Sequence, residues 1–129
     1  MWFSILAIGL GAALGANLRW ALSLMLNALF PPLPPGTLVA NLLGAWLIGI
    51  AFALFNLLPE LSPHWKLFVV TGFLGALTTF STFSLEITGQ LQAGRYLSAL
   101  AGISAHLAGS LLMTALGMAC VILVRQCLR

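Results

Sequence analysis

The sequence predicts an all-α membrane protein with four transmembrane helices, the third of which is broken. Its 129 residues are 61% hydrophobic and 5% charged, whereas soluble domains average about 45–50% and about 25%. A water-soluble fold of this composition would lack a polar surface. Apolar residues also fill four runs long enough to span a bilayer. Within the third run, glycines, hydroxyls and aromatics gather between Gly72 and Ser84, a mixture that weakens a regular helix.

The first run is nearly continuous and is interrupted by Arg19. It is longer than about 30 Å of hydrocarbon requires, so this helix must tilt or emerge near Arg19. Gly11 and Gly15 precede Arg19 at four-residue spacing, which predicts a face for close helix contact. Arg19 itself is either a snorkelling interfacial residue or an anion-attracting one. The run lacks a basic start and a clear cleavage site, so we interpret it as a retained helix.

We expect a single domain over residues 1–129 with spans near residues 2–30, 37–58, 65–93 and 96–124.

The second run follows PPLPPG, Pro31 to Gly36, where proline ends the first helix. Thr37 and Asn41 are four residues apart and therefore share one helix face. An amide in hydrocarbon must find partners. Asn41 is therefore expected either to bond a neighbouring helix or to serve a ligand.

The third run holds the unusual stretch near its centre. About 18 Å of helix lies on each side of the suspected break, which places the break near the bilayer midplane. Irregular backbone at that depth is tolerated only where protein or a water-filled cavity satisfies it, so coordination of an ion is the economical explanation. Glu86 lies two turns beyond the break, where a functional role and a pairing role both fit.

The fourth run carries a polar stripe that could face a wet track. Its members recur every four residues on one face: Ser98, Gly102, His106, Ser110 and Thr114. A lone membrane histidine invites a proton-relay interpretation, but no acid accompanies His106 on this helix.

The few charges bear on topology. Lys66, Arg125 and Arg129 fall on one side of a four-span chain, and Arg95, with Arg19 near it, falls on the other. This weak bias barely selects an orientation under the positive-inside rule, so insertion in both orientations is compatible with the sequence. A unit this small with many small-residue faces favours association, and an antiparallel homodimer is the expected form. Nucleic-acid binding is not expected because no basic patch can form.

Three segments carry a close resemblance to a known family. They are GLGAALGANLRW (Gly9 to Trp20), GTLVANLLGAWLIG (Gly36 to Gly49) and GFLGALTTFSTF (Gly72 to Phe83). Together they resemble the CrcB/Fluc fluoride channel family, and the resemblance covers all four spans. It implies a passive fluoride-selective channel of the bacterial inner membrane, not an enzyme, that lowers cytoplasmic fluoride. It also implies a dual-topology homodimer with two pores and a central structural sodium ion.

The resemblance further implies roles for individual residues. The fluoride pore would be lined by Asn41, Phe80 and Phe83, with Thr37 and Ser110 in a polar track. Backbone carbonyls of Gly75 and Thr78 would bind sodium. Arg19, His106 and Glu86 are further candidates for a vestibule or polar track. The fourth helix departs from the family pattern, because Gly102 and His106 stand where Tyr or Ser is common.

The implied chemistry is physically reasonable. Fluoride is strongly hydrated, so its pore must offer donors without binding it too tightly to release, and phenylalanine ring edges carry the positive end of the quadrupole. A hard cation prefers oxygen ligands. The alternatives are a small dual-topology multidrug exporter, which would normally need an acid absent from residues 2–30, and a non-transporting membrane assembly subunit.

Overall fold

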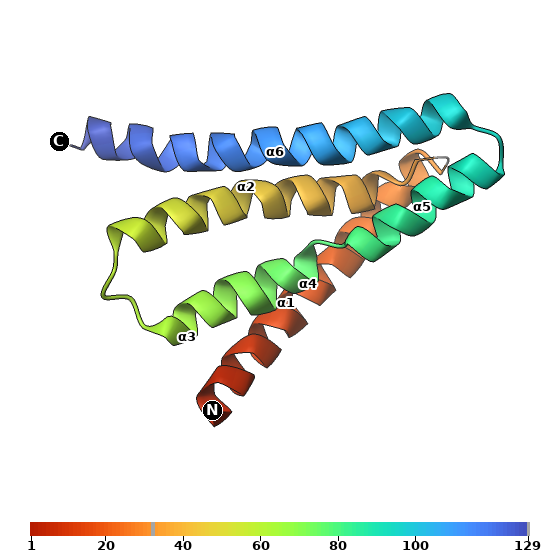
Figure 1. Cartoon of the computed structure of the whole chain (residues 1–129). Coiled ribbons are helices and arrows are strands. Elements are labelled where there is room, and N and C mark those ends of the chain that lie inside the picture. Colours follow the sequence, from red (N-terminus) through yellow and green to blue (C-terminus); the bar gives the residue numbers. More distant parts are fainter. Residues whose placement is uncertain (32, 129) are drawn as a thin grey trace.

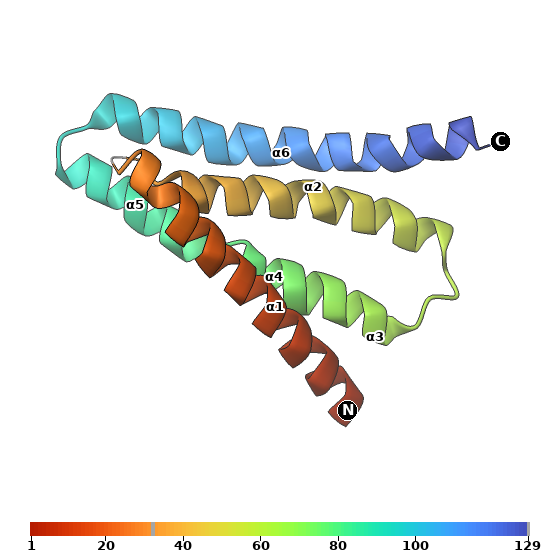
Figure 2. The same cartoon turned by 180° about the vertical axis from the view of Figure 1, so that it is seen from behind.

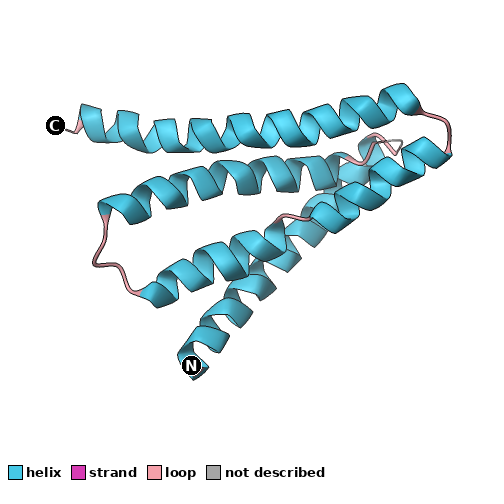
Figure 3. Ribbon diagram, viewed as in Figure 1, coloured by secondary structure: helices cyan, strands magenta, loops and turns pink. Residues whose placement is uncertain are grey.

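The computed structural model describes residues 1–31 and 33–128, and every regular element in them is helical (Figure 3). Pro32 and Arg129, which entered the sequence predictions, lie outside the described residues. Four helical spans are long and apolar enough to cross a membrane. This confirms the prediction of an all-α chain with four membrane-spanning segments. They run over Trp2–Leu29, Pro35–Leu57, Pro63–Gln92 and Tyr96–Cys127.

The first span consists of α1 (Trp2–Leu26) and a 3₁₀ turn, η1 (Asn27–Leu29). The second span is α2 (Pro35–Leu57) and the fourth is α6 (Tyr96–Cys127). The third span is composite: α3 (Pro63–Lys66), a π-helical segment η2 (Leu67–Leu74), α4 (Gly75–Leu77) and α5 (Phe80–Gln92). Proline occupies the first turn of α2 and of α3, where its missing N–H costs nothing.

Helices α2 and α6 lie side by side and run in the same direction, as both views show (Figures 1 and 2). Small residues allow their backbones to approach. A methyl group on Gly49 would collide with the carbonyl of Thr114, and one on Gly117 would collide with that of Trp46. The glycines therefore bring these two helices into backbone contact.

Helix α1 crosses the third span on the other side of the molecule (Figure 1). The predicted small face of α1 makes this contact, because a Cβ on Gly11 would meet the carbonyl of Phe68 and one on Gly15 would meet that of Phe73. Gly72 faces back towards Ile8. These contacts hold the third span against α1 directly before its break.

The apolar core lies beside the break. Ala40, Leu74 and Leu77 form one buried cluster, and Leu77 is fully buried. The chain then reverses from α5 into α6 through Gly94, whose φ of 71° is one that side chains rarely adopt. This turn returns α6 to the face of α2 that carries Asn41.

Candidate functional site

The third span is interrupted at Thr78 and Thr79. Thr78 has φ −82° and ψ 154°, and Thr79 has φ −150° and ψ 115°. Both are extended conformations, so the helix stops at Leu77 and begins again at Phe80. The break expected from the run of glycines and hydroxyls is therefore present, and the preceding π-helical segment η2 adds a second irregularity of a kind common at functional sites.

Asn41 of α2 fills the break with its amide. The Thr79 N–H donates to Asn41 Oδ1 at 2.7 Å, and Asn41 Nδ2 donates to the Thr79 carbonyl at 3.1 Å. In a continuous α-helix the Thr79 N–H would bond the carbonyl of Gly75. Because Asn41 takes that donor, the Gly75 carbonyl loses its helical partner.

Thr79 starts the second half of the span as an N-cap. Its hydroxyl oxygen accepts from the Thr82 N–H at 3.2 Å, the usual capping bond of a threonine at this position. That N–H would otherwise bond the carbonyl of Thr78. The two carbonyls expected to serve sodium, those of Gly75 and Thr78, are thus both relieved of their helical donors.

A third carbonyl at the break is satisfied from α1. Arg19 Nε donates to the Ala76 carbonyl at 3.0 Å, a charge-assisted bond. Arg19 therefore caps the end of α4. Its expected vestibule role stays a prediction.

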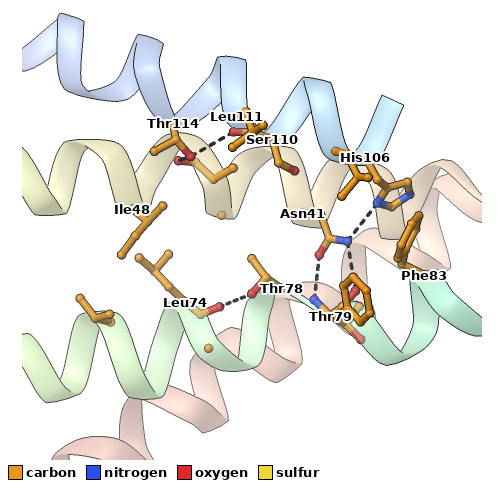
Figure 4. Close-up of a pocket in the computed structure, with 16 residues that line it drawn as sticks. Asn41, Ile48, Leu74, Thr78, Thr79, Phe83, His106, Ser110, Leu111 and Thr114 are labelled. Carbon is orange, nitrogen blue, oxygen red and sulfur yellow. Dashed lines mark hydrogen bonds between the residues drawn. The ribbon is translucent and has the colours of Figure 1, made fainter. Parts of the chain in front are cut away.

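An open groove of about 530 Å³ runs along the break and between α4 and the α2–α6 pair (Figure 4). Figure 4 shows Asn41, Thr79 and His106 converging at one end of it. Seven predicted site residues line it: Asn41, Gly75, Thr78, Phe80, Phe83, His106 and Ser110. The lining continues through Thr79, Thr114, Gly44, Ala45, Ile48, Val70, Leu74, Leu107 and Leu111. Residues of α2, η2, α4, α5 and α6, together with the two residues of the break, thus share one surface.

The two phenylalanines differ in environment. Phe83 is 8% exposed, whereas Phe80 is 73% exposed, and their ring centroids lie 5.3 Å apart. Phe83 also packs on His106 with centroids 4.6 Å apart. Phe83 is therefore part of the core, whereas the Phe80 side chain is exposed on the surface of the chain.

Asn41 also links α2 to α6. Its Nδ2 lies 3.1 Å from His106 Nδ1, and His106 is only 5% exposed. Asn41 thus joins the helix break to the histidine of the fourth span, a junction that no spacing within one helix could predict.

Thr37 and Glu86, like Arg19, lie outside the groove lining. Buried Thr37 donates its hydroxyl proton to Glu86 Oε1, which ties α2 to α5. Glu86 therefore has the partner that a pairing role requires, and its functional role stays a prediction. Ser110 lines the groove, and its carbonyl accepts from Thr114 Oγ1 at 3.0 Å.

Thr79 is the site residue that the sequence did not separate from its hydroxyl neighbours. Its position immediately before a new helix, with Thr82 three residues later, is the signal that could have identified it. The Thr79 N–H donates to the Asn41 side chain and the Thr79 carbonyl accepts from it. These two bonds fix the backbone of the break relative to α2.

Comparison with known proteins identifies the family of the chain. A family model described as "CrcB-like protein, Camphor Resistance (CrcB)" matches residues 6–118. A protein of Chromohalobacter salexigens named fluoride-specific ion channel FluC is 75% identical over 119 residues, 92% of this chain and 90% of its own. Proteins of the same name from Pseudomonas putida (60% identical, 90% and 91% covered) and Marinobacter nauticus (59%, 97% and 99%) are also similar. The chain belongs to the CrcB-like protein family.

Proposed function

We propose that this protein is a passive fluoride-selective channel of the bacterial inner membrane that lets fluoride leave the cytoplasm. The observation that carries the proposal is the groove that joins the Asn41 amide, the Phe80 and Phe83 rings and the broken helix. Relatives similar over nine-tenths of their length are named fluoride-specific ion channels, which places the function among channels and not enzymes.

The groove has the chemistry expected of an anion path. The Ser110 hydroxyl offers a donor, the Asn41 amide can donate to an ion that displaces one of its present bonds, and the phenylalanine pair offers positive ring edges. Such a lining replaces part of the hydration shell of fluoride and holds the ion by weak interactions that also let it leave. A narrow apolar passage would solvate the larger chloride ion poorly.

A second copy of the chain is needed to close this path. Gly75 and Thr78, whose carbonyls the break releases, line an open groove, and carbonyls without partners facing lipid would cost several kcal/mol each. Phe80 projects from the same surface. An antiparallel partner would cover this face, and the partner's groove would form the second pore.

The same pairing accounts for the released carbonyls. If two breaks meet on a two-fold axis, Gly75 and Thr78 of each chain present four oxygens to one point. A hard monovalent cation such as sodium suits this set, and it would offset the cost of leaving carbonyls unbonded in a membrane.

Fluoride flux tests the function. Purified protein in vesicles loaded with potassium fluoride should release fluoride once valinomycin is added, and vesicles loaded with potassium chloride should keep their chloride. Phe80→Ile and Phe83→Ile should each lower the fluoride rate while the dimer stays folded. Phe52→Ile is a matched control because Phe52 is exposed on α2 and outside the groove. No flux from folded dimer would refute the channel, and unchanged rates in both groove variants would refute the aromatic path.

Labelling tests the antiparallel assembly. Cys120 and Cys127 are replaced by serine, and single cysteines are then placed in the Pro59–Ser62 loop and at Ala93, in the turn between α5 and α6; these two connections lie at opposite ends of the bundle (Figure 1). An impermeant thiol reagent should label each position from the outside of intact cells. Labelling of only one position would contradict dual topology.

A further inference from the structure

The hydrogen bonds at the break determine which nitrogen of His106 carries a proton. A backbone N–H can only donate, so the Thr79 N–H identifies the Asn41 atom 2.7 Å away as the carbonyl oxygen. The other amide atom of Asn41 is then the nitrogen, which donates to the Thr79 carbonyl and towards His106 Nδ1. His106 Nδ1 must accept, and in the neutral ring the proton resides on Nε2.

This arrangement uses both amide protons of Asn41. One goes to the Thr79 carbonyl and the other to His106 Nδ1, each at 3.1 Å. An anion that reaches Asn41 along the groove must therefore displace a hydrogen bond that the protein already makes. With His106 neutral, Asn41 therefore has no free N–H group for an anion.

Protonation of His106 would change its Nδ1 from a hydrogen-bond acceptor into a donor. A charged imidazole carries protons on both nitrogens, so Nδ1 would no longer accept and would face the Asn41 N–H as a second donor. Two donors 3.1 Å apart repel each other unless an acceptor lies between or beside them. A small anion is such an acceptor, and a charged donor makes the stronger bond.

We propose that Asn41 and His106 form a proton-linked anion site, closed when His106 is neutral and open to fluoride when it is charged. The inference rests on the proposed channel function and assigns His106 as the residue that controls access to the Asn41 donor. The Phe83 ring packs beside the imidazole, with centroids 4.6 Å apart and ring planes tilted by 39°.

Few other ionisable groups share this environment. Helices α2 and α5 pack against α6. Helix α2 carries no titratable residue, and α5 carries only Glu86, whose Oε1 is bonded to Thr37. On α6 itself, the other titratable side chains are Tyr96 in the first turn and Cys120, Arg125 and Cys127 in the last two or three turns. Among the titratable side chains of these three helices, His106 is therefore the one that contacts Asn41.

Electrical recording tests the proposal on the full-length protein. Fluoride currents are measured in planar bilayers at equal pH on both sides, from pH 8.5 to pH 6, because undissociated hydrogen fluoride carries no current. Removal of one competing hydrogen bond should raise the fluoride conductance at low fluoride concentration by about fivefold as pH falls. His106→Asn keeps an acceptor at the Nδ1 position but does not titrate, so its conductance should stay at the high-pH level throughout.

The control is His64→Gln, because His64 is the other of the two histidines and is exposed on α3. It should keep the wild-type pH dependence. A wild-type conductance that is independent of pH, or the same pH dependence in His106→Asn, would overturn the inference and leave the channel standing. The absence of fluoride current at every pH would instead overturn the channel.

A spectroscopic measurement keeps the test independent of conduction and of how His106→Asn folds. In the His64→Gln background, ¹⁵N-histidine labelling reports on His106 alone. The imidazole shifts should show the Nε2–H tautomer at pH 8.5. At pH 7, added fluoride should increase the charged fraction of His106 by reciprocal linkage, whereas chloride should not. An Nδ1–H tautomer, or no response to fluoride, would refute the proposal.

Discussion

Replacement of Asn41 by alanine should destabilise the protein at the helix break in particular. The substitution removes three hydrogen bonds, to the Thr79 N–H at 2.7 Å and to the Thr79 carbonyl and His106 at 3.1 Å each. Hydrogen bonds in membrane proteins average about 0.6 kcal/mol, and those in soluble proteins about 1 kcal/mol. We therefore expect Asn41→Ala to lower the free energy of unfolding by about 2–3 kcal/mol.

Two measurements check this magnitude and its location. Equilibrium unfolding in mixed micelles with increasing sodium dodecyl sulfate gives the change in stability. Hydrogen exchange of the segment around Thr79 gives the location, because that amide loses its acceptor. A local loss of about 2 kcal/mol corresponds to roughly thirtyfold faster exchange where the segment opens and recloses many times before each exchange event.

Asn17→Ala is the matched control. Asn17 is also a span asparagine, but its amide donates to the Ala13 carbonyl of its own helix at 2.7 Å and bridges no two elements. It should cost less than 1 kcal/mol, within the range of an exposed helical site. If Asn41→Ala and Asn17→Ala destabilise equally, or exchange near Thr79 is unchanged, Asn41 does not support the break.

Three further changes test the framework around the break by the same unfolding measurement. Gly44→Ala would drive a methyl group into Thr78 and should cost about 1–3 kcal/mol, whereas Gly89→Ala meets nothing within 4 Å and should be nearly neutral; equal effects would contradict the close packing. Arg19→Gln removes the charge-assisted bond to the carbonyl at the end of α4 and should cost about 1.5–3 kcal/mol, and full stability in Arg19→Gln would show that this carbonyl needs no cap. Gly94→Ala imposes a side chain at φ 71° and should cost about 1–2 kcal/mol, a prediction that fails if the variant unfolds like wild type.

The sequence by itself determined the class of the protein and the place of its irregularity. A chain with 5% charged residues cannot cover a soluble fold, and four apolar runs become four spans because the bilayer demands internally bonded helices. Gly11 and Gly15 also indicated correctly which face of the first helix packs closely. The hydroxyl run before Phe80 predicted the break because such side chains compete for the backbone locally.

Only the tertiary structure decided which partners complete the break. Thr79 is satisfied by Asn41, 38 residues away, and Asn41 in turn meets His106 at a separation of 65 residues. Periodicity assigns each of these residues to a helix face, but it does not specify the rotation and axial offset of one helix against another. Those quantities follow from the packing of small residues such as Gly44 against Thr78. Hydrogen bonds depend on tenths of an ångström, so the network at the break exists only once that packing is set.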